Sequence, residues 1–164
     1  MSRHFITKQF MRFMFNNKNQ FHFFAFLFFA SVIFSCKKDK PIYSNVPEIS
    51  SVSVNPTTVR EYKDSIAFKL SYVDGNGDLG ENDPNVTNLF LTDNRVNITY
   101  GFRISQLAPD NANIVIKGQL LVVLKNTGIT DNSSSQTVTY SLYLKDRSGN
   151  QSNTISTESI MVEK

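Results

Sequence analysis

The feature that most constrains the fold is a strict alternation of apolar and other residues over positions 66–72. Four large apolar side chains stand at every second position, with polar Lys69 and Ser71 among the residues between them: Ile66, Phe68, Leu70 and Tyr72. Because successive side chains of a β-strand point to opposite faces, this run predicts a strand with one face buried in a core.

Shorter runs of the same kind recur between turn signals such as Asn55-Pro56 and Asp93-Asn94. They predict seven strands, around residues 49–54, 66–72, 89–91, 98–104, 114–124, 138–144 and 155–162, with a bulge at Gly118. Many short alternating strands are typical of a sandwich. We therefore predict an all-β fold, a seven-stranded antiparallel immunoglobulin-like sandwich.

The first 35 residues differ in composition from the rest of the chain. They hold four Lys/Arg, no Asp/Glu and 11 of the 14 Phe. A basic opening before the apolar run "FFAFLFFASVIF" at 23–34 is typical of a secretory signal, because a membrane span needs about 20 residues. From Cys36 onward, 13 Lys/Arg stand against 14 Asp/Glu. The basic pI therefore belongs to the leader, and no nucleic-acid partner is expected.

The only cysteine, Cys36, follows this run in "VIFSC" and precedes "KKDK". A small residue before a lone cysteine at this place resembles the lipobox of bacterial lipoproteins, although Phe34 stands where a small residue is more usual. The resemblance implies cleavage before Cys36, lipidation of its thiol and attachment to a membrane. It implies a signal peptide at 1–35, a lipidated cysteine and tether at 36–46, and a β-sandwich domain at 47–164.

The exported part also resembles small lipoproteins of Bacteroidetes-type bacteria that carry an immunoglobulin-like or fibronectin type III-like domain. "DGNGDLG" after the second predicted strand and "LYLKDRSGNQS" near the last one carry this resemblance. It implies a lipid-anchored protein of the cell outer membrane, at the periplasmic face or the cell surface. The basic "KKDK" favours the periplasmic face, because surface export in these bacteria is thought to depend on acidic residues after the cysteine.

The exported part lacks several residues that catalysis commonly uses. After Cys36 there is no His, no Trp and no further Cys. Ser-His-Asp and Cys-His chemistry therefore lacks its base, and a Cys/His zinc site lacks its ligands. Two carboxylates could still serve a hydrolase, but the acids gather in one turn. We expect a non-catalytic domain, with a carboxylate-dependent hydrolase as the alternative.

An acidic segment follows the alternating run. No Lys or Arg occurs between Lys69 and Arg95, and the interval holds five acids: Asp74, Asp78, Glu81, Asp83 and Asp93. Asp, Asn and Gly dominate tight turns, because they accept positive φ and hydrogen-bond to their own backbone. Turn formation alone does not explain five uncompensated charges.

Asp74, Asn76 and Asp78 occupy alternate positions, and this spacing resembles the start of the calcium loops of EF-hand proteins. The resemblance implies side-chain ligands at these three positions and a carbonyl ligand at Gly80. Leu79 departs from it, because an EF-hand has Gly there, and the Glu expected at position 85 is Asn.

Two readings of this segment stay open: a looser Ca²⁺ loop completed by Glu81 or Asp83, and a plain acidic turn. In a sandwich of the predicted kind, the loops after the second, fourth and sixth strands lie at one end, with the start of the first strand. The acidic loop should therefore lie near Asp110, near the turn 146–150 and near the tether. Asp146 would then be a remote ligand or a cap of its own turn.

The triplet Asp64-Ser65-Ile66 resembles the O-glycosylation acceptor of these bacteria, which implies Ser65 as a modified residue. Together, these features predict a membrane-anchored lipoprotein whose β-sandwich is a non-catalytic binding or structural domain. Its expected contacts are the membrane, through the lipid anchor, and a protein partner. The alternative is a subunit of a surface or uptake assembly, which an exposed, unpaired edge strand would favour.

Overall fold

The computed structural model describes residues 42–164, so the predicted signal segment, Cys36 and the lysines after it lie outside the described residues. The described residues form ten strands and no helix: β1 (Glu48–Asn55), β2 (Thr58–Arg60), β3 (Ser65–Asp74), β4 (Leu89–Asp93), β5 (Ile98–Phe102), β6 (Ile116–Lys125), β7 (Ser135–Val138), β8 (Tyr140–Leu144), β9 (Ile155–Ser156) and β10 (Ile160–Glu163). Within this part of the chain, no helix is long and apolar enough to cross a membrane.

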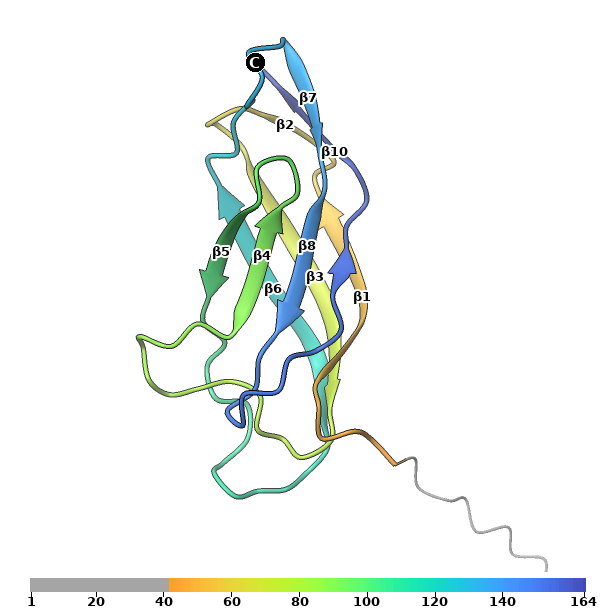
Figure 1. Ribbon diagram of the computed structural model, residues 1–164, viewed down its shortest axis with the longest axis vertical. Helices are drawn as coiled ribbons and strands as arrows, with labels where there is room; N and C mark the ends of the chain where they lie inside the picture. Colours follow the sequence, from red (N-terminus) through yellow and green to blue (C-terminus); the bar gives the residue numbers. More distant parts are fainter. Residues whose placement is uncertain (1–41) are drawn as a thin grey trace, which may run out of the picture. The chain divides into compact units, whose positions relative to one another are not determined.

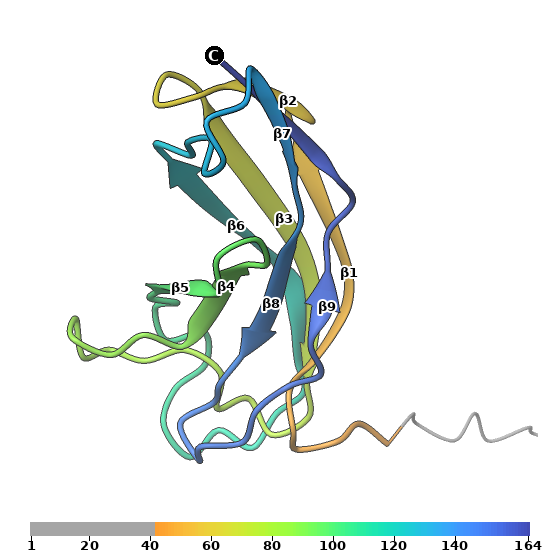
Figure 2. The ribbon, with the colours of Figure 1, turned by 45° about the horizontal axis from the view of Figure 1, so that its top comes forward.

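The strands form a β-sandwich with two facing layers (Figure 1). One layer has the strand order β1-β3-β6, and the other has the order β5-β4-β8-β9. A third, smaller sheet, β2-β10-β7, continues the sandwich at one end, which lies at the top of the view in Figure 2. All neighbouring strands are antiparallel except β2 and β10, which are parallel.

The core lies between the two layers and is built from the alternating faces of their strands. In β3, the alternating residues Ile66, Phe68 and Leu70 are fully buried, and in β8 Tyr140 and Leu142 are too. The rings of Phe68 and Tyr140 meet edge to face across the core, with centroids 5.2 Å apart. Each such side chain contributes about 1.5–3 kcal/mol by leaving water, so the predicted burial of the 66–72 face is confirmed.

The predicted all-β antiparallel architecture is confirmed, but the number of seven strands is wrong. The predicted strand 138–144 is divided into β7 and β8, because the chain passes from one sheet to another at Thr139. The last predicted strand is likewise divided into β9 and β10. The additional strand, β2, has only three residues, too few to show an alternating pattern.

The predicted bulge at Gly118 is also wrong. The register between β3 and β6 runs without interruption from Ser65 opposite Lys125 to Asp74 opposite Ile116. Gly118 instead lies opposite Tyr72, and a Cβ added there would stand 3.3 Å from the tyrosine hydroxyl oxygen. The glycine therefore makes room for an aromatic ring rather than for an extra residue.

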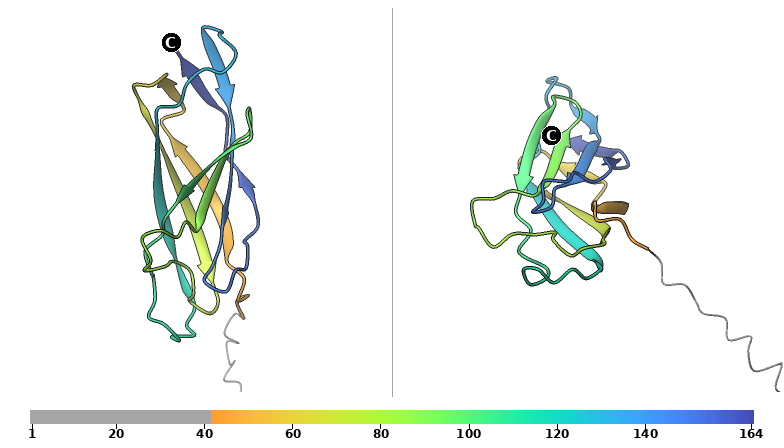
Figure 3. Two further views of the ribbon diagram at one scale, coloured as in Figure 1. Left: turned by 60° about the vertical axis from the view of Figure 1, so that its left-hand side comes forward. Right: turned by 60° about the horizontal axis from the view of Figure 1, so that its bottom comes forward.

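The loops after β3, β5 and β8 gather at the end of the sandwich where β1 begins (Figure 3). These loops comprise residues 75–88, 103–115 and 145–154. The described part of the tether reaches the same end, because the backbone N–H of Gly75 donates to the carbonyl oxygen of Ser44 at 2.8 Å. The predicted grouping of the acidic loop and the turn 146–150 at the end where residues 42–46 lie is confirmed.

Candidate functional site

The acidic loop leaves β3 at Asp74 and packs closely against the segment before β6. Gly77 has φ of 77°, and a Cβ added there would stand 2.6 Å from the carbonyl oxygen of Ile114. Gly80 has φ of 88°, and a Cβ there would overlap the carbonyl of Ser105. Turn geometry and close packing therefore account for these glycines, but not for the acids around them.

Asp74, the last residue of β3, is fully buried. Its Oδ2 accepts a hydrogen bond of 2.9 Å from the backbone N–H of Leu79, whereas its Oδ1 has no partner. Burial raises the pKa of this carboxyl group; the Leu79 N–H partly offsets the rise, and the charges of Asp78 and Asp146 add to it. The backbone N–H of Asn76 also favours the charged form of Asp74, although it does not form a hydrogen bond with Oδ1.

Asn76 and Asp78, at the next two alternate positions, also carry an unpaired oxygen. The Oδ1 atoms of both side chains are buried and have no hydrogen-bond partner. In Asp78, Oδ2 accepts a hydrogen bond of 2.5 Å from the hydroxyl of Ser148. Among the described residues, these two oxygens and Asp74 Oδ1 are the buried side-chain atoms without a partner. Each such orphan costs about 1–3 kcal/mol, and more when charged.

The turn 146–150 is bonded directly to the acidic loop. The backbone N–H of Arg147 donates to the carbonyl oxygen of Asp78 at 3.1 Å. Its guanidinium donates to the carbonyl oxygen of Gly80 at 2.8 Å and lies 3.8 Å from a carboxylate oxygen of Asp110. Arg147 therefore links three segments, and its guanidinium forms an ion pair with Asp110 rather than with Asp74 or Asp78.

Glu81 and Asp83 fold back on their own turn. Oε1 of Glu81 accepts the backbone N–H of Asn82 at 2.7 Å, and Oδ1 of Asp83 accepts the backbone N–H of Asn85 at 2.9 Å. Asp83 is exposed to solvent. These two side chains have a local structural role, and the structure does not show them completing a shell around Asp74.

Asp146 caps its own turn. Its Oδ1 accepts the backbone N–H of Asn150 at 2.8 Å, and its Oδ2 accepts the side-chain amide of Asn150 at 2.9 Å. The carbonyl of Gly80 is likewise engaged, by Arg147. Of the seven candidate ligands, the structure thus leaves free, buried side-chain oxygens at Asp74, Asn76 and Asp78.

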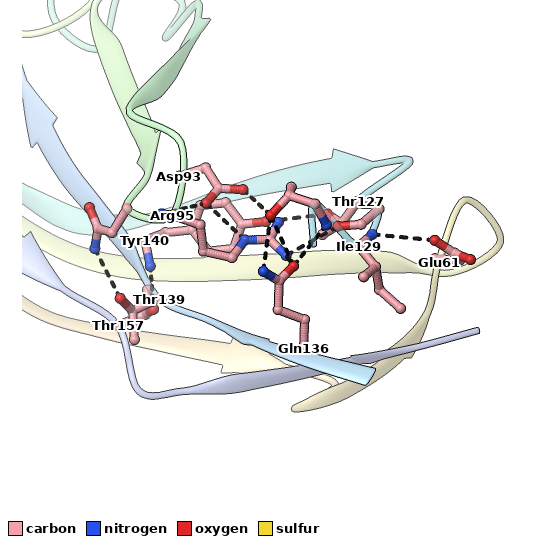
Figure 4. Close-up of polar contacts among 12 residues, drawn as sticks. Glu61, Asp93, Arg95, Thr127, Ile129, Gln136, Thr139, Tyr140 and Thr157 are labelled. Atoms are coloured by element: carbon pink, nitrogen blue, oxygen red, sulfur yellow. Dashed lines mark hydrogen bonds and ion pairs between the residues drawn. The ribbon is translucent and has the colours of Figure 1, made fainter. Parts of the chain in front are cut away.

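Asp93 is not part of this group, so the expectation of five uncompensated acids is wrong. Asp93 is buried at the far end of β4 and forms a bidentate ion pair with Arg95, with contacts of 2.7 and 3.1 Å. Figure 4 shows that Arg95 also donates to Gln136, at 2.7 Å. The close spacing of Asp93 and Arg95 around one turn was an available sequence signal for this pair.

A surface hollow of about 480 Å³ lies beside the acidic loop, and Asn76, Asp78, Asp110, Arg147 and Ser148 are among its lining residues. Over residues 42–164, no three His, Cys, Asp or Glu side chains are arranged to hold a metal ion. The three unpaired oxygens of the acidic loop belong instead to two carboxylates and one amide, those of Asp74, Asp78 and Asn76. A bound cation would therefore complete its shell with main-chain oxygens or water.

The predicted glycosylation site lies at the opposite end of β3 from Asp74. Ser65 begins β3 and is exposed, and its glycosylation stays a prediction. The neighbouring Asp64 is held by the guanidinium of Arg60 at 3.0 and 3.1 Å, and this hydrogen bonding lowers the pKa of Asp64 to about 2.

Comparisons with known proteins assign no family. No protein-family model matches the chain, and no curated protein matches it. A solved structure of a Niemann-Pick type C2 protein from Japanese carpenter ant aligns with a TM-score of 0.41 and 6% identity, over 76% of this chain and 96% of that chain. A similarity this low assigns neither fold family nor function.

Proposed function

We propose that the protein is a lipoprotein of the cell outer membrane, anchored through Cys36, whose immunoglobulin-like sandwich is a non-catalytic domain that binds a protein partner. The chain passes between the two layers after β3, after β5 and again between β6 and β8. Such alternation of layers is typical of Greek-key sandwiches of the immunoglobulin kind.

The burial of Asp74 supports a non-catalytic role. A carboxylate-dependent hydrolase needs two fixed carboxylates that contact the substrate across a cleft. Asp74 is fully buried, and Asp78 is held by Ser148. Asp74 and Asp78 therefore do not flank an open substrate site.

The observation that carries the binding proposal is the free edge of β6. This ten-residue strand pairs with β3 alone, and its outer edge forms no backbone hydrogen bond within residues 42–164. On its outward face, Leu121 is 68% exposed and Val123 is 43% exposed. A long apolar edge strand is a template for pairing with another chain.

The same side of the sandwich also presents β5, the edge of the other layer (Figures 1 and 2). Ile98 in β5 is 51% exposed. Addition of a partner strand to β6 would use main-chain hydrogen bonds for affinity and the apolar side chains for specificity. This edge also favours the second candidate function, a subunit of a surface or uptake assembly.

A photo-crosslinking amino acid at position 121 tests this proposal in the full-length protein, expressed in its native cell envelope. We expect a discrete crosslinked product, because a partner strand paired with β6 would place its own side chains beside Leu121. The same amino acid at Glu158, an exposed position between β9 and β10, is the matched control and should give none. Equal products at both positions, or none at 121, would contradict partner binding at this edge.

A further inference from the structure

We infer that the loop after β3 binds one calcium ion through the side-chain oxygens of Asp74, Asn76 and Asp78. This site is independent of the β6 edge and of the lipid anchor. It stands on the three buried oxygens that lack a partner within the described residues, together with the alternate spacing of the residues that carry them.

The two carboxylates are prepared in the same way. In Asp74, Oδ2 is fixed by the backbone N–H of Leu79, and Oδ1 is left over. In Asp78, Oδ2 is fixed by the hydroxyl of Ser148, and again Oδ1 is left over. Metal-ligating carboxylates are commonly oriented by such hydrogen bonds to their second oxygen. The protein therefore holds both groups in place without satisfying them.

A cation fits these three oxygens better than water molecules do. Water could donate hydrogen bonds to them, but it would leave the charges of Asp74 and Asp78 unbalanced, and none of the ion pairs in residues 42–164 involves either of them. The guanidinium of Arg147, whose backbone N–H is bonded to Asp78, contacts Gly80 and Asp110 instead.

The chemistry of the donors selects calcium. All three are oxygens, which suit hard cations, whereas Zn²⁺ prefers the nitrogen and sulfur ligands that this segment lacks. Ca²⁺ accepts six to eight oxygens in flexible geometry, whereas Mg²⁺ demands a near-ideal octahedron. The hollow beside Asn76 and Asp78 gives room for the water ligands that a three-residue donor set requires.

A calcium ion here would stabilise the end of the sandwich that carries the tether. Asp78 is bonded to Ser148 and, through its carbonyl, to Arg147, while Gly75 is bonded to Ser44. The ion would neutralise the repulsion between Asp74 and Asp78 and so hold the acidic loop, the turn 146–150 and residue 44 together. Removal of calcium should loosen all three.

The test is calorimetric titration of the EDTA-treated, full-length protein in mild detergent with calcium chloride, followed by thermal unfolding with and without calcium. We expect one site per chain. At about a hundredfold excess of calcium over its Kd, the midpoint should rise on the order of 10 °C. Asp74→Asn and Asp78→Asn keep the shape of the side chain and should each weaken calcium binding about tenfold or more, because affinity depends on the number of charged ligands.

Asp83→Asn is the matched control, because it removes the same charge from the same loop at a side chain that caps Asn85. It should leave the affinity for calcium within about twofold, because Asp83 is not one of the three ligands. An absence of both heat and midpoint shift in the wild-type protein would overturn the inference, whatever the variants do. An equal loss in Asp83→Asn would also overturn it, in favour of diffuse attraction to an acidic surface. Equal affinity for magnesium would exclude a calcium-selective site.

Discussion

At the residue scale, Asp74 shows how a β-strand can end in a side chain that the fold does not satisfy. The register of β3 places Asp74 opposite Ile116 of β6, on the buried face of the strand. The alternation that buries Ile66, Phe68 and Leu70 therefore also buries the carboxylate. A charged oxygen left unpaired there weakens the fold until a partner binds it.

The pH dependence of Asp74 should reveal this cost in the absence of calcium. Its pKa is raised above the ordinary 3.8 by burial, so the folded state holds this proton more tightly than the unfolded state. Its contribution to stability is therefore present below pH 3.8 and is lost as the pH rises through the raised pKa. In EDTA, Asp74→Asn should remove this loss and increase the free energy of unfolding at pH 7 by about 1 kcal/mol.

Urea unfolding at several pH values would measure the effect. Asp64→Asn is the contrasting variant, because the pKa of Asp64 is lowered to about 2 by Arg60. The contribution of Asp64 is present above pH 3.8 and is lost as the pH falls towards 2, which is the opposite sign. A destabilised Asp74→Asn protein in EDTA would argue that the unpaired oxygen is satisfied by the fold itself.

At the scale of elements, the ion pair of Asp93 and Arg95 joins segments that are distant in the sequence. Arg95 follows β4, and its guanidinium contacts the carbonyl oxygen of Gly128 at 3.1 Å and Gln136 of β7 at 2.7 Å. The pair therefore fastens the turn between β4 and β5 to the loop before β7 (Figure 4). This network lies at the end of β4 remote from the acidic loop.

Arg95→Met should destabilise the protein by about 3–5 kcal/mol, because it leaves the buried carboxylate of Asp93 unpaired. The double variant Asp93→Asn/Arg95→Met should recover part of this loss, since it also removes the unpaired charge. Chemical denaturation of the three proteins measures both effects. A loss below about 1 kcal/mol in Arg95→Met would place the pair among solvent-screened surface contacts.

At the scale of the whole molecule, the free edge of β6 and the end that carries residues 42–46 are separate features. The described tether contacts Gly75 in the acidic loop, whereas Leu121 and Val123 lie along β6. The proposed anchor would thus hold the domain through one end and leave a long edge strand free for a partner. Calcium would act at the anchored end, on the loop that the tether contacts.

Cys36→Ser should abolish membrane attachment without unfolding the domain, because Cys36 precedes the compact unit of residues 42–164. Phase partition in a cloud-point detergent would show the wild-type protein in the detergent phase and the variant in the aqueous phase. Labelling of cells with an alkyne-bearing fatty acid should mark the wild-type protein alone. Detergent partition of Cys36→Ser would instead indicate attachment by the apolar segment or by another part of the chain.

The strands and their buried faces could be predicted largely from the sequence, because side-chain alternation is a local property of a strand. The buried face of β3 and the turn between β4 and β5 are examples. The spacing of Asp74, Asn76 and Asp78 is local as well, and it selected the three residues that the structure leaves unpaired.

Only the tertiary structure decided which strands pair and which polar groups find partners. The change of sheet at Thr139, the parallel pairing of β2 with β10 and the contacts of Arg95 with Gly128 and Gln136 could not be derived from the local pattern. The tertiary structure also shows that Asp146 and Glu81 cap turns, whereas Asp78 does not. The physical reason is that the partner of a hydrogen bond is set by proximity in space and not by proximity in the sequence. Asp78 and Ser148 follow strands of different layers and become neighbours only when the two layers pack together.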